Sequence, residues 1–475
     1  MRKMERSKLV AARVRRNWTL EQASERLQVD LNTLYKWESG RSSPRAYNVQ
    51  RLCEVYQATP WELGIGSKKG ACAEALPVSN STLPSSLADD LTTHLFALVI
   101  VAHEYDLHEL QRLQTRVSVT LERFDAMNFD KPNYSITRRV AIQRLASLPL
   151  ISLNLNTLGA VLQYPLEDIL TQCSAGIIAC EQLSSKGTHE DMALAWSILS
   201  AYIPTLKAIV KESSQHRKAA SNLMTQCLQL KARLAYHLAD ARQALSYAEQ
   251  AVSYAQESGD RLLPIAALQN LSIAYFVNNQ SQKMLQVSQK TQHIMENLKD
   301  AAPSLMQSWV YANLAKYQAI NGGKREISAL LDKAHKTFFS SPDTENSPNF
   351  VSHSRANLIR QEGMAYIFLG RYDSALDCFG QIIDLDNDNL CTKVPVGTHT
   401  HLGVICKATL ASLKLPTAKK DKYLSLKLWK TGIEKAKILQ SELYFNEACL
   451  SYQIMEGIWS DDHEVRELRD LIVHW

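Results

Sequence analysis

The sequence predicts an all-α protein, in which a small basic helical domain is joined by a linker to a long, curved array of paired helices. Only 17 of the 475 residues are Gly, whereas β-sandwiches and phosphate-binding α/β enzymes use more glycine in their turns. From residue 89 onward, almost every segment carries apolar residues at helical spacing. The second half of the chain repeats one helix-pair pattern, which completes the case for this fold class.

The composition is that of a globular chain without a membrane segment. Hydrophobic residues make up 45% of the chain and charged residues 21%, which is sufficient for sizeable cores. The longest candidate apolar run, at 95–102, is too short to cross a bilayer, and the N-terminus leads into a basic helix instead of a signal core. The nine cysteines include no CxxC pair, which predicts free thiols. We therefore expect a cytoplasmic protein that does not contact a membrane.

Positive charge is concentrated at the N-terminus. Residues 1–66 contain 12 Lys and Arg against 7 Asp and Glu, and the remaining residues contain 41 of each. An excess of positive charge that is confined to one small segment is typical of a domain that binds the phosphates of a nucleic acid.

Changes in composition divide the chain further. We expect four regions: a basic domain at 1–66, a flexible linker at 67–90, a helical region at 91–215 and a repeat array at 216–475. Within the helical region, the pattern predicts helices over 91–127 and 134–148, followed by two or three helices interrupted at Pro165 and Pro204.

The basic domain is predicted to contain five short helices. Their expected ranges are 7–16, 20–27, 31–38 and 47–56, with a last helix starting near residue 60. Thr19 and Asp30 are suitable N-caps for the second and third helices, and Gly40 ends the third.

Helical geometry decides which side chains of the third helix are exposed. Leu34 and Trp37 are three residues apart and must share the buried face. At 100° per residue, Asn32, Tyr35 and Lys36 then point away from that face, and Thr33 lies on its flank. Asn can read adenine, Lys can reach guanine or a phosphate, and Thr can pack against a thymine methyl group. These side chains suit a recognition helix in the major groove of DNA.

The loop after this helix offers backbone N–H groups and guanidinium groups for phosphate. The predicted DNA-contacting residues are Arg16, Asn32, Thr33, Tyr35, Lys36, Arg41, Ser42, Arg45 and Asn48. A basic helical domain used for protein contacts is the alternative that the residues leave open.

Residues 19–44 resemble the XRE family of helix-turn-helix repressors, most specifically through Trp37, Glu38, Gly40 and Pro44. The resemblance implies a five-helix DNA-binding domain in which Glu38 pairs with Arg13 of the first helix, so both would be structural. Leu20 stands where the family often has Gln, so no DNA contact is assigned to it.

The clearest internal repeat occupies residues 359–379. Gly363 and Ala375 allow two antiparallel helices to approach closely, and Gly370 ends the first helix. Tyr366, Tyr372 and Phe379 are expected to fill the space between the helices. This pattern resembles the tetratricopeptide repeat, although Ile359 stands where that repeat prefers Trp.

Weaker copies precede this repeat. Ala244, Met284 and Ile327 match the position of Ala375 at intervals longer than the ~34 residues of the regular repeat. Stacked pairs of this kind are expected to form a right-handed α-solenoid with an inner groove. The remaining predictions are long loops at 340–353 and 386–400, a further helix pair at 400–414 and 421–440, and a cap at 461–473.

Polar side chains recur on the first helix of each pair, which lines the groove. Aligning three repeats places Asn270, Asn313 and Gln361 at one shared position, and carboxamides can both donate to and accept from a peptide backbone. We hypothesise a short-peptide site, with Lys316 or Arg360 near a carboxylate. The predicted ligand-binding residues are Gln269, Asn270, Tyr275, Asn313, Lys316, Asn357, Arg360 and Gln361. A solvated helix face is the competing interpretation.

An XRE domain followed by such repeats resembles the RRNPP group of peptide-pheromone receptors. The resemblance implies a homodimeric transcription regulator that binds a double-stranded DNA operator and senses a short peptide. The alternative is an interaction scaffold, whose repeats bind a partner protein while the N-terminal domain acts as a tether.

No sequence motif for catalysis was found, including GxxxxGK[ST], GxGxxG, GxSxG and HExxH. His399 and His401 are interpreted as a surface pair and not as metal ligands, because few acidic residues lie nearby. We therefore predict neither an enzyme, nor a metal site, nor a cofactor.

Overall fold

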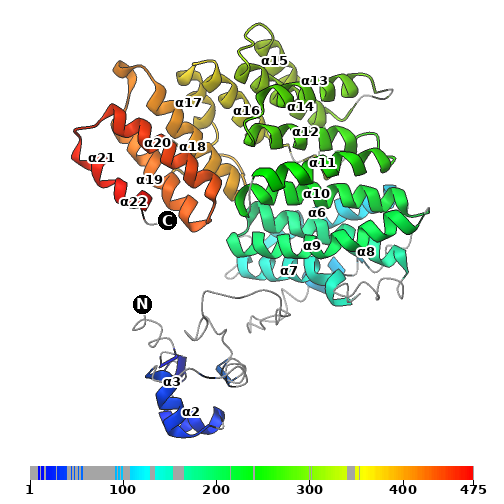
Figure 1. Cartoon of the computed structure of the whole chain (residues 1–475), viewed down its shortest axis with the longest axis vertical. Helices are drawn as coiled ribbons and strands as arrows, with labels where there is room; N and C mark the ends of the chain where they lie inside the picture. Colours follow the sequence, from blue (N-terminus) through cyan, green and yellow to red (C-terminus); the bar gives the residue numbers. More distant parts are fainter. Residues whose placement is uncertain are drawn as a thin grey trace. The chain divides into compact units, whose positions relative to one another are not determined.

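The computed structural model divides into two compact units, Met1–Ser81 and Thr82–Trp475, which are described separately (Figure 1). The residues it describes are 9–10, 12–14, 16, 18–27, 29–39, 44, 48, 52, 55–56, 91–93, 95–96, 98–99, 107–128, 134–152, 165–213, 215–238, 241–298, 300, 302–339, 348–351 and 353–473. These residues contain helices and no β-strand, apart from one isolated antiparallel bridge between Ile383 and Thr392. The protein is all-α, as predicted.

The first unit is organised around the helices α2 (Leu20–Leu27) and α3 (Leu31–Glu38). Both helices begin where the capping residues predicted them to begin. Asp30 caps α3 by accepting a hydrogen bond from the backbone N–H of Asn32. One apolar cluster joins these helices to the flanking helical residues, and its buried members are Leu9, Ala12, Ala23, Leu27, Leu34, Trp37, Leu52 and Tyr56. Gly40 and the helix expected near residue 60 lie outside the described residues.

The second unit is a stack of helices. Its upstream helices are α6 (Leu107–Asn128), α7 (Tyr134–Ser152), α8 (Leu166–Lys186) and α9 (His189–Glu212). Four helix pairs follow: α10 (Arg217–Leu238) with α11 (Ala241–Glu257), α12 (Leu263–Val277) with α13 (Ser281–Glu296), α14 (Ser304–Ile320) with α15 (Ile327–Phe339), and α16 (Arg355–Phe368) with α17 (Tyr372–Gly380). The C-terminal elements are α18 (Thr398–Lys414), η3 (Thr417–Lys419), α19 (Lys422–Ile438), α20 (Glu442–Ile458), α21 (His463–Glu467) and α22 (Arg469–Val473).

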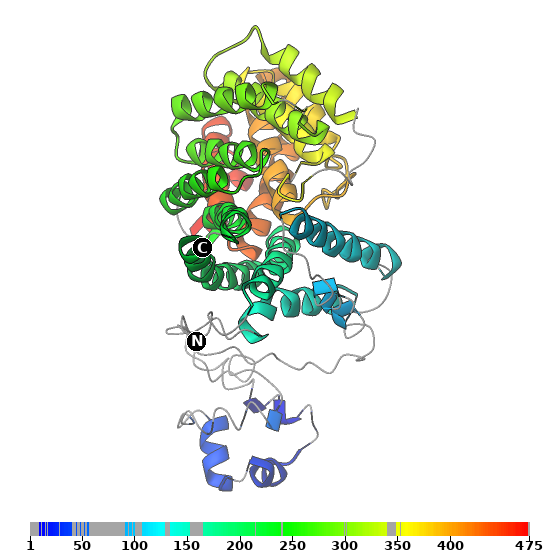
Figure 2. The same ribbon diagram turned by 90° about the vertical axis from the view of Figure 1, so that its right-hand side faces the viewer.

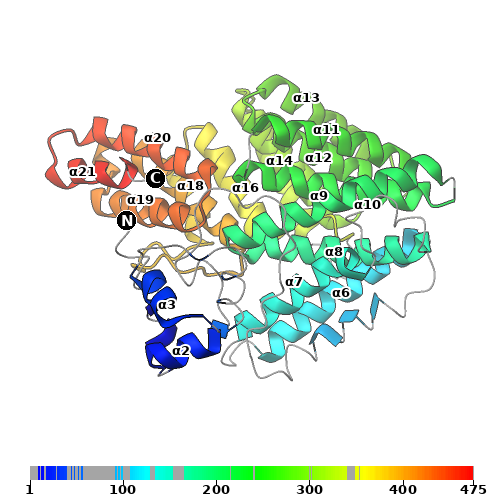
Figure 3. The ribbon, with the colours of Figure 1, turned by 60° about the horizontal axis from the view of Figure 1, so that its bottom comes forward.

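Neighbouring pairs pack against each other, so the helices form successive layers (Figure 2). The packing continues upstream of residue 216, because α10 contacts α8 and α9 as well as α11 and α12. Figure 3 shows α6 and α7 beside α8, in agreement with the contacts between these helices. The helical region at 91–215 is therefore part of the same compact unit as the repeats.

In the clearest repeat, residues 359–379, α16 and α17 approach each other closely, as the small residues of the repeat predict. A Cβ atom added at Gly363 would lie 2.7 Å from Cε1 of Phe379, whose side chain is completely buried. Gly370 has φ of +72° at the end of α16, a conformation that favours glycine. Ala244, Met284, Ile327 and Ala375 are all buried, as expected for equivalent core positions.

Two helices differ from the prediction. Pro204 lies inside α9 and does not interrupt it, because packing of α9 against α8 and α10 outweighs the loss of one backbone hydrogen bond. The helix α20 was not predicted, and it follows α19 after a short turn at Gln440, where φ is +48°.

Among the described helices, α9 alone is long and apolar enough to span a membrane by length and composition. Residues along its length are buried in the core, including Met192, Ile198 and Leu206. This burial is typical of a core helix. The described cysteines are all free, and Cys173, Cys180, Cys227, Cys378 and Cys406 are buried.

Candidate DNA-binding helix and a polar pocket in the repeat array

Helix α3 separates a buried face from an exposed face. Leu34 is completely buried and Trp37 is 8% exposed, whereas Asn32 and Lys36 are exposed and Tyr35 is 46% exposed. Thr33 is half-buried on the flank of the helix. The side chains predicted to face DNA therefore project from a helix whose other side is fixed in the core.

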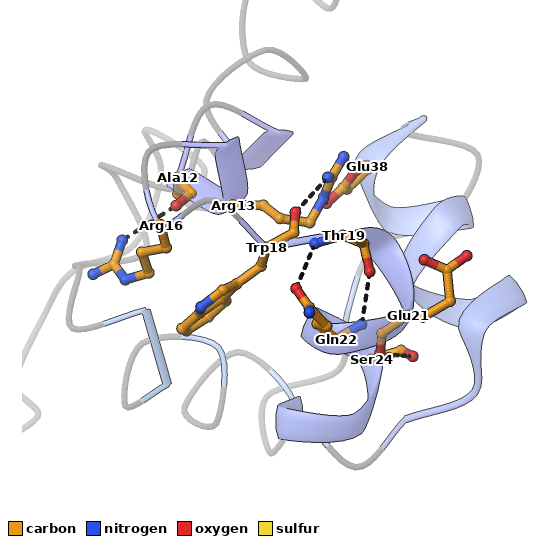
Figure 4. Close-up of polar contacts among 9 residues, drawn as sticks. All are labelled: Ala12, Arg13, Arg16, Trp18, Thr19, Glu21, Gln22, Ser24 and Glu38. Atoms are coloured by element: carbon orange, nitrogen blue, oxygen red, sulfur yellow. Dashed lines mark hydrogen bonds and ion pairs between the residues drawn. The ribbon is translucent and has the colours of Figure 1, made fainter.

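A buried ion pair fixes the end of α3 against the first helical segment. Nε and Nη2 of Arg13 donate to the two carboxylate oxygens of Glu38, at 2.8 and 3.0 Å, and Nη1 donates to the carbonyl of Trp18 (Figure 4). The hydrogen bond to Glu38 raises the pKa of Arg13 further. This bidentate pair is the one implied by the XRE resemblance.

Helix α2 begins with a reciprocal cap, visible in Figure 4. The backbone N–H of Gln22 donates to the hydroxyl of Thr19, and the backbone N–H of Thr19 donates to the side chain of Gln22, at 3.2 and 3.0 Å. Leu20 packs against the core of this unit.

The other predicted DNA contacts have different surroundings. Arg16 donates to the carbonyls of Ala12 and Tyr56, and its guanidinium lies over the ring of Trp18, so its side chain is already used within the domain. Asn48 is half-buried. Arg41, Ser42 and Arg45 lie outside the described residues.

The second unit contains a pocket of about 210 Å³. It lies on the side of the array that is formed by the first helix of each pair. Its walls come from α8, α10, α12, α14, α16, the first turn of α18 and Phe350 in the segment before α16. The lining residues are Ile177, Glu181, Gln226, Gln229, Leu230, Arg233, Asn270, Ile273, Trp309, Phe350, Asn357, Arg360, Gln361 and Thr400. Nine of these side chains are polar or charged and five are apolar, so the lining is mainly polar.

Half of the predicted ligand-binding residues line this pocket. Asn270, Asn357, Arg360 and Gln361 do so. The other four are placed elsewhere: Gln269 is completely buried, Tyr275 reaches Glu249 at 3.4 Å, and Asn313 and Lys316 form a buried hydrogen bond with each other at 3.3 Å.

The sequence interpretation missed the contribution of α8 and α10. Gln226, Gln229 and Arg233 lie on one face of α10 at helical spacing, and Glu181 lies opposite on α8. Extending the repeat register one pair upstream identifies the α10 residues, because the same spacing of polar side chains recurs there.

Several polar atoms in the lining have no partner. Nε2 of Gln229, Nε of Arg360 and Oε1 of Gln361 are buried without a hydrogen bond. Gln226 is satisfied instead, since it accepts from Gln114 and donates to Asn222. Buried polar atoms are costly when unpaired, so the first three are candidates for ligand contacts.

Lys316 does not line the pocket and is buried beside aromatic rings. Its Nζ lies 4.4 Å from the ring centroid of Tyr317 and 5.0 Å from that of Phe276. Burial lowers the pKa of Lys316 well below its ordinary value, and the positive charge of Arg360 lowers it further.

Two C-terminal helices pack against helices that line the pocket: α18 contacts α8, and α20 contacts α10. The ring of His399 lies 4.2 Å from that of His237 on α10, centroid to centroid, and both lie near Tyr444. A Cβ added at Gly397 would lie 2.6 Å from the carbonyl oxygen of Ser185 at the end of α8. The expectation of a surface histidine pair was wrong for His399, which these packed helices enclose, and burial lowers its pKa to about 4.

His401 is half-buried, and its Nε2 lies 2.9 Å from the carbonyl oxygen of Leu390. Within the described part of the chain, no group of three or more His, Cys, Asp or Glu side chains could hold a metal ion.

Residues 9–63 match the helix-turn-helix family. The N-terminal unit contains an XRE-type helix-turn-helix domain. A search of curated proteins found no match.

Among solved structures, the chain is similar to PlcR of Bacillus thuringiensis, whose crystal structure is described as a complex with the peptide PapR7 and DNA. The identity is 12% and the TM-score 0.31, over 70% of this chain and 94% of PlcR.

Proposed function

We propose that this protein is a cytoplasmic transcription regulator, in which the helix-turn-helix domain binds a double-stranded DNA operator and the repeat unit binds a short peptide. The observation that carries the proposal is the exposed face of α3, where Asn32, Tyr35 and Lys36 project from a helix anchored by the Arg13–Glu38 pair. A rigid helix with amide and ammonium groups on its free side is suited to reading base edges in the major groove.

The net charge supports this assignment. The excess of positive charge in residues 1–66 attracts the phosphate backbone, while the equal numbers of acidic and basic residues in the rest of the chain give no such attraction. Most of the non-specific affinity for DNA is therefore expected from the N-terminal domain.

The pocket supports the second half of the proposal. Unpaired amide atoms of Gln229 and Gln361 offer a donor and an acceptor, which match the alternating groups of a peptide backbone. A volume of about 210 Å³ fits part of a short, extended ligand better than a folded partner.

The expected mechanism is a population shift in a homodimer. A peptide in the pocket favours one arrangement of the repeat units, and this changes the spacing of the two recognition helices on their half-sites. Only a ligand with different affinities for the two arrangements can produce this effect.

Selection of bound fragments from random double-stranded DNA tests the DNA-binding half. The full chain is expected to enrich a defined sequence and to bind it with an affinity that falls steeply with salt. The double substitution Asn32→Ala and Lys36→Ala should lower this affinity at least tenfold, because each good base contact contributes about 1–3 kcal/mol. Lys290→Ala on α13, which removes an exposed cation from the repeat unit, is the matched control and should leave it unchanged.

Two outcomes would contradict the proposal. If no sequence is enriched, the domain does not read DNA, and the scaffold interpretation is favoured. If the double variant binds the selected DNA as tightly as the original chain, α3 is not the recognition helix.

A further inference from the structure

One positively charged side chain in the pocket has no negatively charged partner among the described residues. Three charged side chains line it, and two of them neutralise each other: Arg233 donates to Glu181 at 2.9 Å. The third is Arg360. Among the residues that the structure describes, Arg360 forms no hydrogen bond and no ion pair, and its Nε is buried.

A buried lysine on α14 also has no acidic partner among the described residues. Lys316 is 3% exposed, and its Nζ contacts only the amide oxygen of Asn313 and two aromatic rings. The side chains of Lys316 and Arg360 interact unfavourably, since the charge of Arg360 disfavours the charged form of Lys316. No described carboxylate pairs with either residue.

This arrangement is unfavourable in the empty protein. Arg360 is half-buried and has no acidic partner among the described residues, and a charge withdrawn from water is costly unless it is paired. The positive charge of Arg360 also disfavours the charged form of Lys316. Where a protein has no group of opposite charge beside a buried charged side chain, a bound ligand commonly provides that group.

We infer that the pocket binds its ligand through a carboxylate, which lies against the guanidinium of Arg360. This inference rests on the proposed peptide-binding function and specifies the chemistry of that ligand. The unpaired Nε2 of Gln229 is a further donor in the same pocket, and the unpaired Oε1 of Gln361 accepts a hydrogen bond from a ligand N–H. Both side chains are 5% exposed, so the pocket provides enclosed polar groups for the ligand.

A carboxylate can come from the C-terminus of a peptide or from an acidic side chain. Two random hexapeptide libraries distinguish these sources, one with free C-terminal carboxylates and one with C-terminal amides. Each library is equilibrated with the full-length protein, and the retained peptides are identified by mass spectrometry. If only peptides with a free C-terminus are retained, the carboxylate that binds is the C-terminal one. If peptides rich in Asp or Glu are retained from both libraries, it belongs to a side chain.

The substitution Arg360→Gln should reduce retention of the carboxylate peptides at least tenfold, because it removes the charged partner. Arg242→Gln is the matched control, since Arg242 is exposed on α11, and it should retain the same peptides. A second variant, Gln361→Glu, places a carboxylate inside the pocket. It should raise the melting temperature of the repeat unit, measured in the peptide-free full-length protein, and weaken binding of the same peptides.

Retention of peptides without any preference for a carboxylate, or equal retention by Arg360→Gln, would overturn the inference and leave the proposed peptide function intact. Equal retention of the carboxylate peptides by Gln361→Glu would also overturn it, because a carboxylate beside Arg360 should compete with that of the ligand. Retention of no peptide from either library would overturn the proposed function, and the inference with it.

Discussion

Both units have amide and amino groups at their candidate binding sites, but these groups are exposed in the first unit and buried in the second. In the helix-turn-helix domain, the amide of Asn32 and the ammonium of Lys36 are exposed. In the repeat unit, the amide of Gln361 and the amino group of Lys316 are almost completely buried. Exposed groups suit a large polyanion that docks from outside, whereas buried groups suit a small ligand that is enclosed.

The difference extends to how each unit handles buried charge. The helix-turn-helix domain buries Glu38 with a bidentate partner. The repeat unit buries Lys316 without one. The first unit thus pairs this buried carboxylate within the domain, whereas Arg360 and Lys316 of the second unit have no acidic partner among the described residues. A ligand carboxylate would supply one. Three predictions test this contrast.

The largest effect is expected for Glu38→Gln. The substitution leaves Arg13 partly buried without its carboxylate, and breaking a buried pair costs about 3–5 kcal/mol. Because few residues form the core of the domain, we expect it to unfold and DNA binding to be lost. Hydrogen exchange of the full chain should show loss of protection in α2 and α3 and unchanged protection in the repeats.

Glu25→Gln is the control for this experiment, because Glu25 is exposed on α2. Protection of α2 and α3 should be unchanged in this variant. If Glu38→Gln instead reduces protection in the repeat helices, the stabilities of the two units are not independent.

An intermediate effect is expected for Gly363→Ala in the repeat unit. The new Cβ would lie 2.7 Å from Cε1 and 2.9 Å from Cζ of the buried Phe379, so overpacking should cost about 1–3 kcal/mol. Gly457 on α20 provides the matched control, since a Cβ there meets no atom within 4 Å. Gly457→Ala should stabilise the helix by roughly 0.5–1 kcal/mol. Equal melting temperatures for the two variants would contradict the close packing of α16 and α17.

The smallest effect concerns pH. Residues 1–66 contain no histidine, whereas burial lowers the pKa of His237 and of His353 to about 3 and that of His399 to about 4, from an ordinary value of 6.5. The unfolded chain therefore binds more protons between these values and pH 6.5. The repeat unit should lose stability as pH falls through this window, by up to about 1.4 kcal/mol per pH unit for each histidine.

Thermal unfolding at several values between pH 7 and pH 5 measures this slope. His399→Phe should reduce it, since both ring nitrogens of His399 are buried without partners and its neighbours His237 and Tyr444 are aromatic. An unchanged slope would show that His399 does not contribute. Protection of α2 and α3 against hydrogen exchange should vary little over the same range.

Local patterns predicted the helix-turn-helix domain well. Spacing of Leu34 and Trp37 was sufficient to orient α3, and Thr19 and Asp30 marked the starts of two helices, because caps and helical faces depend on residues a few positions apart. The Arg13–Glu38 pair came from the resemblance to a known family and not from spacing.

Long-range packing limited the prediction of the pocket. The repeat register placed Asn270 and Gln361 on the lining, but it also included Asn313, whose oxygen is taken by Lys316. Trp309 lies one turn earlier on α14 and occupies the pocket wall. Spacing within one helix does not reveal which neighbouring group competes for an amide, and it does not reveal that α8 and α18 meet at the same pocket.

That meeting of α8 and α18 has a mechanical consequence. Ile177 and Thr400 lie in the same pocket wall although most of the array separates them in sequence, and Gly397 lies directly against Ser185. A molecule bound in this pocket would contact two helices that most of the repeats separate in the sequence. It would therefore hold α8 and α18 together in addition to the contacts that these helices already make.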